Sequence, residues 1–148
     1  MGAVNNPATV TPASYHGVTV ADFQAVAGSG TATSPANIND NTTTTLTTWD
    51  AVGEYVEIKF ADVYKILRWR QWGHVGNNGS GRFSIQYYDL INEVWADLVT
   101  AIPTHTLAGW SSFTTETTTP TDKVRIVATT LDTGGLPSNR TTQWEIIF

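Results

Sequence analysis

The stretch from Gly81 to Trp95 constrains the fold of this chain more than any other part of the sequence. Its apolar side chains recur at every second position, at Phe83, Ile85 and Tyr87. This two-residue period is the pattern of a half-buried β-strand. Asp89 then interrupts the alternation, as a turn residue does, and Trp95 follows six residues later. The stretch therefore predicts a core strand, a hairpin and a return strand that places the Trp95 indole against the core.

The same alternation recurs along the chain, with turn residues between the alternating stretches. These stretches are Glu54–Phe60, Lys123–Ala128 and Thr142–Phe148, and Val63–Trp72 is also strand-like but has a less regular pattern. Thr, a β-branched residue that favours strands, occupies 25 of the 148 positions, and no stretch has the pattern of an amphipathic helix. Short strands at regular spacing predict an all-β, antiparallel β-sandwich. We expect Trp49, Trp69, Trp95 and Trp144 to fill its core.

The length of 148 residues predicts one domain with a single core. Residues 31–148 form the predicted sandwich domain. Residues 1–30 mix Asn, Pro and Gly with small side chains and Thr, which predicts an N-terminal arm or an edge segment. The sequence leaves open whether this arm packs on its own domain or reaches a neighbouring molecule.

Charge and composition exclude several classes of partner. The net charge is −5 and the eight Lys plus Arg residues are scattered, which excludes a nucleic-acid-binding protein. No apolar run approaches the roughly 18 residues that span a bilayer, so we expect no membrane insertion. Residues 1–20 lack the basic and apolar regions of a signal peptide. The chain has no Cys, which excludes disulfides, thiolate metal sites and a Cys nucleophile.

The sequence also lacks the motifs of common catalytic sites. His16, His74 and His105 lie in predicted loops, without the helical i, i+4 spacing of a zinc protease. There is no Gly-x-Ser-x-Gly nucleophile elbow and no phosphate-binding loop. The 13 carboxylates are scattered rather than paired as in a glycosidase. We therefore expect a protein that is not an enzyme.

The order of several features is similar to that of a known family. A loop rich in Asn and Asp ends in Trp49, and alternating strands follow with Asp89 and Trp95 after the central one. The last strand carries Trp144-Glu145-Ile146. Over residues 34–148 this order resembles the discoidin, or coagulation-factor type C, domains and the carbohydrate-binding modules that share their galactose-binding-like jelly roll. The resemblance implies that fold and a non-catalytic binding function.

In that family an Asp of the first loop and a Glu of the last strand commonly help to hold a structural calcium ion. By resemblance these roles fall to Asp40 and Glu145, with backbone carbonyls and a Thr hydroxyl from Asn41–Thr45. The pattern also departs from that of the family, because the spacing from Asp40 to Trp49 is longer and Asn41 stands where Gly is frequent. The alternative is an Asx turn without a metal.

Two predicted loops carry the residue types that bind sugars. A sugar offers an apolar C–H face to an aromatic ring and hydroxyl groups to planar polar side chains. One loop contains Trp72 and His74, and the other contains Asn139 and Arg140. In related carbohydrate-binding modules the ligand lies on such a loop rim, so the resemblance implies that these four residues bind the ligand. The alternatives are a hydrogen bond within the loop for His74 and a place in the core for Trp72.

Two functions fit these observations. The first is a virion component, such as a phage capsid decoration or tail protein, that uses the sandwich for assembly and contacts host glycans. Its partners would be neighbouring virion proteins, with a homo-oligomer left open, and its location the virion surface. The alternative is a carbohydrate-binding module of a polysaccharide-degrading or cell-surface system, which would act outside the cell and bind carbohydrate.

Overall fold

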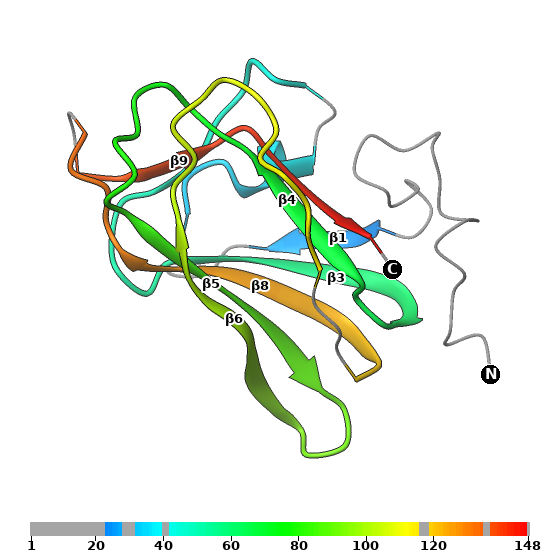
Figure 1. Cartoon of the computed structure of the whole chain (residues 1–148). Coiled ribbons are helices and arrows are strands. Elements are labelled where there is room, and N and C mark those ends of the chain that lie inside the picture. Colours follow the sequence, from blue (N-terminus) through cyan, green and yellow to red (C-terminus); the bar gives the residue numbers. More distant parts are fainter. Residues whose placement is uncertain (1–22, 28–31, 40–41, 116–118, 135–136, 148) are drawn as a thin grey trace.

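The computed structural model describes residues 23–27, 32–39, 42–115, 119–134 and 137–147 (Figure 1). Within these residues the chain forms ten β-strands and one short 3-10 helix. In chain order they are β1 (Phe23–Ala27), η2 (Pro35–Asn39), β2 (Thr47–Trp49), β3 (Tyr55–Tyr64), β4 (Arg68–Trp72), β5 (Arg82–Asp89), β6 (Val94–Pro103), β7 (Thr114–Thr115), β8 (Thr121–Thr130), β9 (Asn139–Thr141) and β10 (Gln143–Ile147). No helix in this described part of the chain is long and apolar enough to span a bilayer.

The strands form two layers. A five-stranded sheet has the order β1-β3-β8-β5-β6, and a three-stranded sheet has the order β10-β4-β7. Strands β2 and β9 form a separate pair. All the strand pairs are antiparallel. Figure 1 shows β4 lying across the layer formed by β3, β8, β5 and β6. The structure thus confirms the predicted all-β, antiparallel sandwich.

The core lies between the two sheets and is centred on Phe83 of β5, which is fully buried. Its ring contacts two buried indoles edge-on, with centroids 4.8 Å from Trp49 and 5.5 Å from Trp144. Ile85 and Ile126, on the neighbouring strands β5 and β8, are buried beside it. The alternation of the central stretch therefore identified a true core strand.

Little of the predicted N-terminal arm falls within the described residues. Residues 1–22 and 28–30 lie outside them. The remaining part, β1, pairs with β3 at the edge of the five-stranded sheet. Whether residues 1–22 form an arm stays a prediction.

Trp95 lies on the outer face of the five-stranded sheet, and the prediction that it packs in the core is wrong. The predicted hairpin is present, and it sets Trp95 directly opposite Tyr88. Paired residues on neighbouring strands share a face. Tyr88 alternates with the inward-facing residues of β5, so its partner faces outward too. The guanidinium of Arg125 lies 4.3 Å from the centre of the Trp95 ring, and the Lys123 ammonium lies 4.1 Å from that of Tyr88.

Replacing Trp95 with Ala should therefore lower the free energy of unfolding by only about 1–2 kcal/mol. A partly exposed aromatic pair and a cation–π contact each contribute about 0.5–1.5 kcal/mol, whereas a buried aromatic contributes about 3–5 kcal/mol. Urea denaturation of the wild type and the variant would measure the difference. A loss above 3 kcal/mol would contradict the outward placement.

Candidate ligand-binding site

A buried carboxylate joins the two predicted loops at one end of the sandwich. Asp132 has no exposed surface. It accepts backbone N–H bonds from the first loop, at 2.9 Å from Asn78, 3.0 Å from Gly79 and 3.4 Å from Gly81. Gly134 of its own loop donates at 2.8 Å, and the Thr104 hydroxyl also donates. Burial alone would raise the pKa of Asp132, but these hydrogen bonds lower it to about 2. The carboxylate is therefore ionised at neutral pH.

A second connection runs through Asn77 and Arg140. The Asn77 amide donates to the Arg140 carbonyl at 2.7 Å and to the His105 carbonyl at 3.0 Å. Its oxygen accepts the Arg140 backbone N–H at 3.3 Å. The Arg140 guanidinium donates in turn to the Gly76 carbonyl at 3.2 Å. The loops that follow β4 and β8 thus meet at one end of the sandwich.

His74 and Arg140 lie next to each other at this loop end. A Cβ atom added to Gly76 would lie 2.8 Å from His74 Nδ1 and 2.9 Å from an Arg140 guanidinium nitrogen. A larger residue at position 76 would therefore require one of these two side chains to shift. His74 Nδ1 accepts the Gly76 N–H at 3.0 Å, which leaves the proton of the neutral ring on Nε2. Partial burial, followed by the charge of Arg140, lowers the pKa of His74 from 6.5, so the ring is neutral at pH 7.

Trp72 ends β4 two residues before His74 and is partly exposed. It pairs with Trp110, whose ring centroid lies 5.4 Å away at an interplanar angle of 82°. Arg68, Arg70 and Trp72 alternate with the buried Trp69 and Gln71, so they face outward from the three-stranded sheet. The structure therefore brings three of the four predicted ligand-binding residues to one end: Trp72, His74 and Arg140.

Asn139, the fourth predicted residue, lies beneath this surface. It is fully buried in β9. Its amide oxygen accepts the Asp132 N–H at 2.7 Å, and its amide nitrogen donates to the carbonyls of Thr130 at 3.0 Å and Arg82 at 3.2 Å. Because these bonds occupy the amide in the interior, we leave Asn139 out of the candidate site.

Of the two predicted calcium ligands, Asp40 lies outside the described residues. Glu145 of β10 stands opposite Arg70 of β4 and forms an ion pair with it. No group of three His, Asp or Glu side chains that could hold a metal occurs in the described part of the chain. The Glu145 carboxylate, which the resemblance assigned to the calcium ion, is therefore paired with Arg70.

A side-chain amide reaches two carbonyls of this loop, and one of them, that of Thr42, lies in the segment that the resemblance assigned to the calcium ion. Gln143 of β10 is fully buried, and its Nε2 donates to the Asn37 carbonyl at 3.1 Å and to the Thr42 carbonyl. A divalent cation also requires oxygen ligands, so it would compete with this N–H group for the same carbonyls. The described residues fit an amide-linked loop better than a calcium site.

We accordingly expect the melting temperature to stay the same in EDTA and in added calcium. Gln143→Ala should lower the free energy of unfolding by about 2–4 kcal/mol, because it removes a hydrogen-bond donor from two carbonyl groups, at a cost of about 1–3 kcal/mol each. Gln86→Ala, on the outer face of the other sheet, serves as the control. A melting temperature that falls by several degrees in EDTA would restore the calcium prediction.

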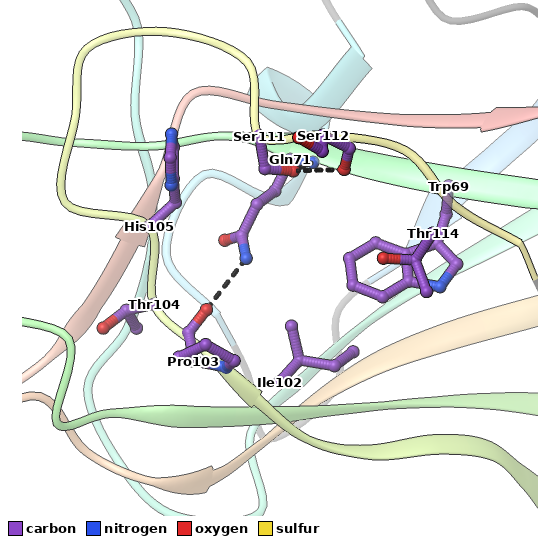
Figure 2. A pocket seen from close by; sticks show the side chains of 9 residues that line it. All are labelled: Trp69, Gln71, Ile102, Pro103, Thr104, His105, Ser111, Ser112 and Thr114. Carbon is purple, nitrogen blue, oxygen red and sulfur yellow. Dashed lines mark hydrogen bonds between the residues drawn. The ribbon is translucent and has the colours of Figure 1, made fainter.

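A separate pocket of about 260 Å³ lies between the two sheets. The residues around it are Trp69, Gln71, Ile102, Pro103, Thr104, His105, Ser111, Ser112 and Thr114 (Figure 2). Figure 2 shows the Gln71 side chain extending toward the Pro103 carbonyl, with Trp69 and His105 at opposite sides of the view. The bond from Gln71 Nε2 to that carbonyl is 2.9 Å long. The pocket combines apolar walls with amide, imidazole and hydroxyl groups.

Neither the role of Asp132 nor this pocket was predicted from the sequence. Asp132 did carry a local signal, because an Asp two residues before a Gly is typical of an Asx turn, and its carboxylate does bond the Gly134 N–H. Its bonds to the other loop span more than 50 residues and had no sequence signal. The pocket had none either, because β4, β6 and the segment after β6 meet only in the folded chain.

No protein-family model and no curated protein sequence matches the chain. Solved structures do. A truncated AlyQ with family 32 carbohydrate-binding and alginate lyase domains covers 86% of this chain with a TM-score of 0.70 and 17% identity, and this chain spans 32% of its length. A pectin-binding carbohydrate-binding module aligns with 86% of this chain and 91% of its own, with a TM-score of 0.69 and 19% identity. The family 32 module of NanJ from C. perfringens, in complex with galactose, covers 82% of this chain and 92% of its own, with a TM-score of 0.59 and 16% identity. The chain thus has the galactose-binding-like β-sandwich fold of the family 32 carbohydrate-binding modules.

Proposed function

We propose that the chain is a non-catalytic carbohydrate-binding module whose ligand lies on the loop end formed by Trp72, His74 and Arg140. One observation carries the proposal. The loops after β4 and β8, far apart in the sequence, are held together by Asp132 and Asn77, so that an imidazole, two residues along the chain from the partly exposed Trp72, stands beside a guanidinium.

The chemistry of the three side chains suits a sugar. The Trp72 ring offers an apolar surface for C–H groups, and Trp110 supports it edge-on. Neutral His74 presents an Nε2–H donor, and the guanidinium of Arg140 adds planar donors. Rigid loops lower the entropy cost of binding, because the polar groups are already positioned.

The similar structures support a binding role over an assembly role. The proteins named above are carbohydrate-binding modules, or a chain in which such a module accompanies a separate lyase domain. They favour the carbohydrate-binding alternative over the predicted virion component. An extracellular location is part of the same proposal.

A glycan-array screen of the chain should give selective binding that Trp72→Ala weakens at least about tenfold, which corresponds to about 1.4 kcal/mol. Arg140→Lys should weaken it too, because Lys keeps the charge but lacks the planar fork of donors. Trp95→Ala changes a partly exposed indole on the outer face of the other sheet and should bind as the wild type does. A blank array from folded protein would overturn the proposal and favour the assembly role.

A further inference from the structure

A continuous row of aromatic rings and guanidinium groups lies along the outer face of β4. At the loop end, the ring centroids of Trp72 and Trp110 are 5.4 Å apart. The Arg70 guanidinium lies 4.4 Å from the centre of the Trp110 ring and 4.2 Å from that of Phe113. The Arg68 guanidinium lies over the same Phe113 ring, at 4.3 Å. These five residues, which we call the β4 row, extend from the proposed sugar site along the three-stranded sheet.

The two guanidinium groups of the β4 row differ in their charge partners. Glu145 forms an ion pair with Arg70 and neutralises its charge. Arg68 is exposed, and its guanidinium contacts the Phe113 ring. Within the described residues, no carboxylate oxygen lies within 4 Å of the Arg68 guanidinium. The row therefore ends in a cation whose charge the described part of the chain does not neutralise.

The chemistry of Arg68 determines what kind of group it can bind. The Phe113 ring covers one side of the guanidinium, and the N–H groups that do not face this ring are open to a ligand because the side chain is exposed. Two of these N–H groups can bind both oxygens of a carboxylate in one bidentate contact. The whole chain has a net charge of −5, so its overall field does not attract anions and the contact depends on this local cation.

The spacing along β4 determines the length of the ligand. Arg68 and Trp72 are four residues apart on one strand, which corresponds to about 13 Å at about 3.3 Å per residue. A single sugar ring on Trp72 does not reach Arg68, whereas a chain of several linked rings does. We propose that the ligand of the loop end is an acidic polysaccharide, whose chain continues along the β4 row and whose carboxylate binds Arg68. This inference rests on the proposed function, because it assigns the charge and the direction of the ligand at the same site.

The proposal is tested by isothermal titration calorimetry of the chain with short acidic oligosaccharides. The probes are the tetramers of galacturonate, mannuronate and glucuronate, each compared with its methyl ester, which keeps the sugar rings and removes the charge. A carrageenan tetrasaccharide, which carries sulfate and no carboxylate, is the comparison for charge alone. At least one of the three acids should bind at least about tenfold more tightly than its ester and than the sulfated probe.

Three variants locate the carboxylate contact. Arg68→Gln should remove the preference for the acid and leave the binding of the ester unchanged. Arg68→Lys should keep only part of the preference, because Lys retains the charge but lacks the planar fork of donors. Arg125→Gln is the matched control, because the Arg125 guanidinium also lies over an aromatic ring, that of Trp95, but on the outer face of the other sheet. This variant should keep the full preference.

The proposal would be overturned if none of the acids bound more tightly than its ester, or if Arg68→Gln left the preference unchanged. Tighter binding of the sulfated probe than of every acid would overturn the assignment of a carboxylate. In each of these cases, a glycan-array signal that Trp72→Ala weakens would still support the loop-end function. A blank array together with no calorimetric binding to folded protein would overturn both the acidic ligand and the proposed function.

Discussion

Asp132→Ala should lower the free energy of unfolding by about 3–5 kcal/mol and separate the two loops that form the candidate site. The fully buried carboxylate accepts four backbone N–H bonds and the Thr104 hydroxyl. Bonds to a charged acceptor contribute about 1.5–3 kcal/mol each. Some of the stranded donors reach water at the loop end, so the total stays below the simple sum.

The pH dependence of the free energy of unfolding reports on the Asp132 carboxylate. The folded-state pKa of Asp132 is about 2, below its ordinary value of 3.8. Its ionised form therefore stabilises the fold above about pH 4, and this contribution is lost as the pH falls through about 2. The lowered pKa of Asp89, which comes from its bonds to Asn92 and Ile91, acts in the same direction. Asp132→Asn should remove only the Asp132 part of the acid sensitivity.

Urea denaturation between pH 7 and pH 2 would measure both effects, with Asp97→Ala as the control. Asp97 is exposed and accepts a hydrogen bond from the Gln86 amide on the outer sheet face, so its loss should cost less than about 1 kcal/mol. If Asp132→Ala cost no more than this control, the carboxylate would not hold the loops together.

Trp49→Ala should also lower the free energy of unfolding by about 3–5 kcal/mol, which corresponds to about 6–20 °C in melting temperature for a chain of this size. The indole is fully buried, its ring centre lies 4.8 Å from that of Phe83, and its Nε1 donates to the Ile126 carbonyl at 3.2 Å. The substitution therefore leaves a large cavity and an unpaired carbonyl.

Trp49→Ala should also disturb the candidate ligand-binding site. Trp49 ends β2, which pairs with β9 through Asn139, next to Arg140. Thermal unfolding of Trp49→Ala and Trp95→Ala compares a fully buried indole with a partly exposed one in the same chain. Equal losses from the two variants would contradict the assignment of Trp49 to the core.

The sequence alone predicted those features that depend on local periodicity. The alternation at Phe83 and Ile85 identified a core strand, because a strand in a sandwich buries every second side chain. Trp49 lies in the core as expected, at the end of a polar loop. The order of these elements also resembled the family whose fold the structure shows.

Local periodicity did not determine which face each tryptophan occupies or which polar groups become buried. Trp95 faces outward because the hairpin register pairs it with Tyr88, and register depends on the partner strand. The sequence favoured Asn139 as a ligand contact, yet its amide is used inside the fold by Asp132 and two carbonyls.

The sequence by itself determined the strand content, the sandwich class and most of the core. Only the tertiary structure decided the junction at Asp132, the contact of His74 with Arg140, and the pocket around Gln71. The physical reason is that strand formation follows from the pattern of neighbouring residues, whereas these sites join segments separated by tens of residues. Their hydrogen bonds form only when the sheets pack and exclude water. Once water is excluded, each buried polar group needs a partner within the protein, and this requirement fixes how the segments meet.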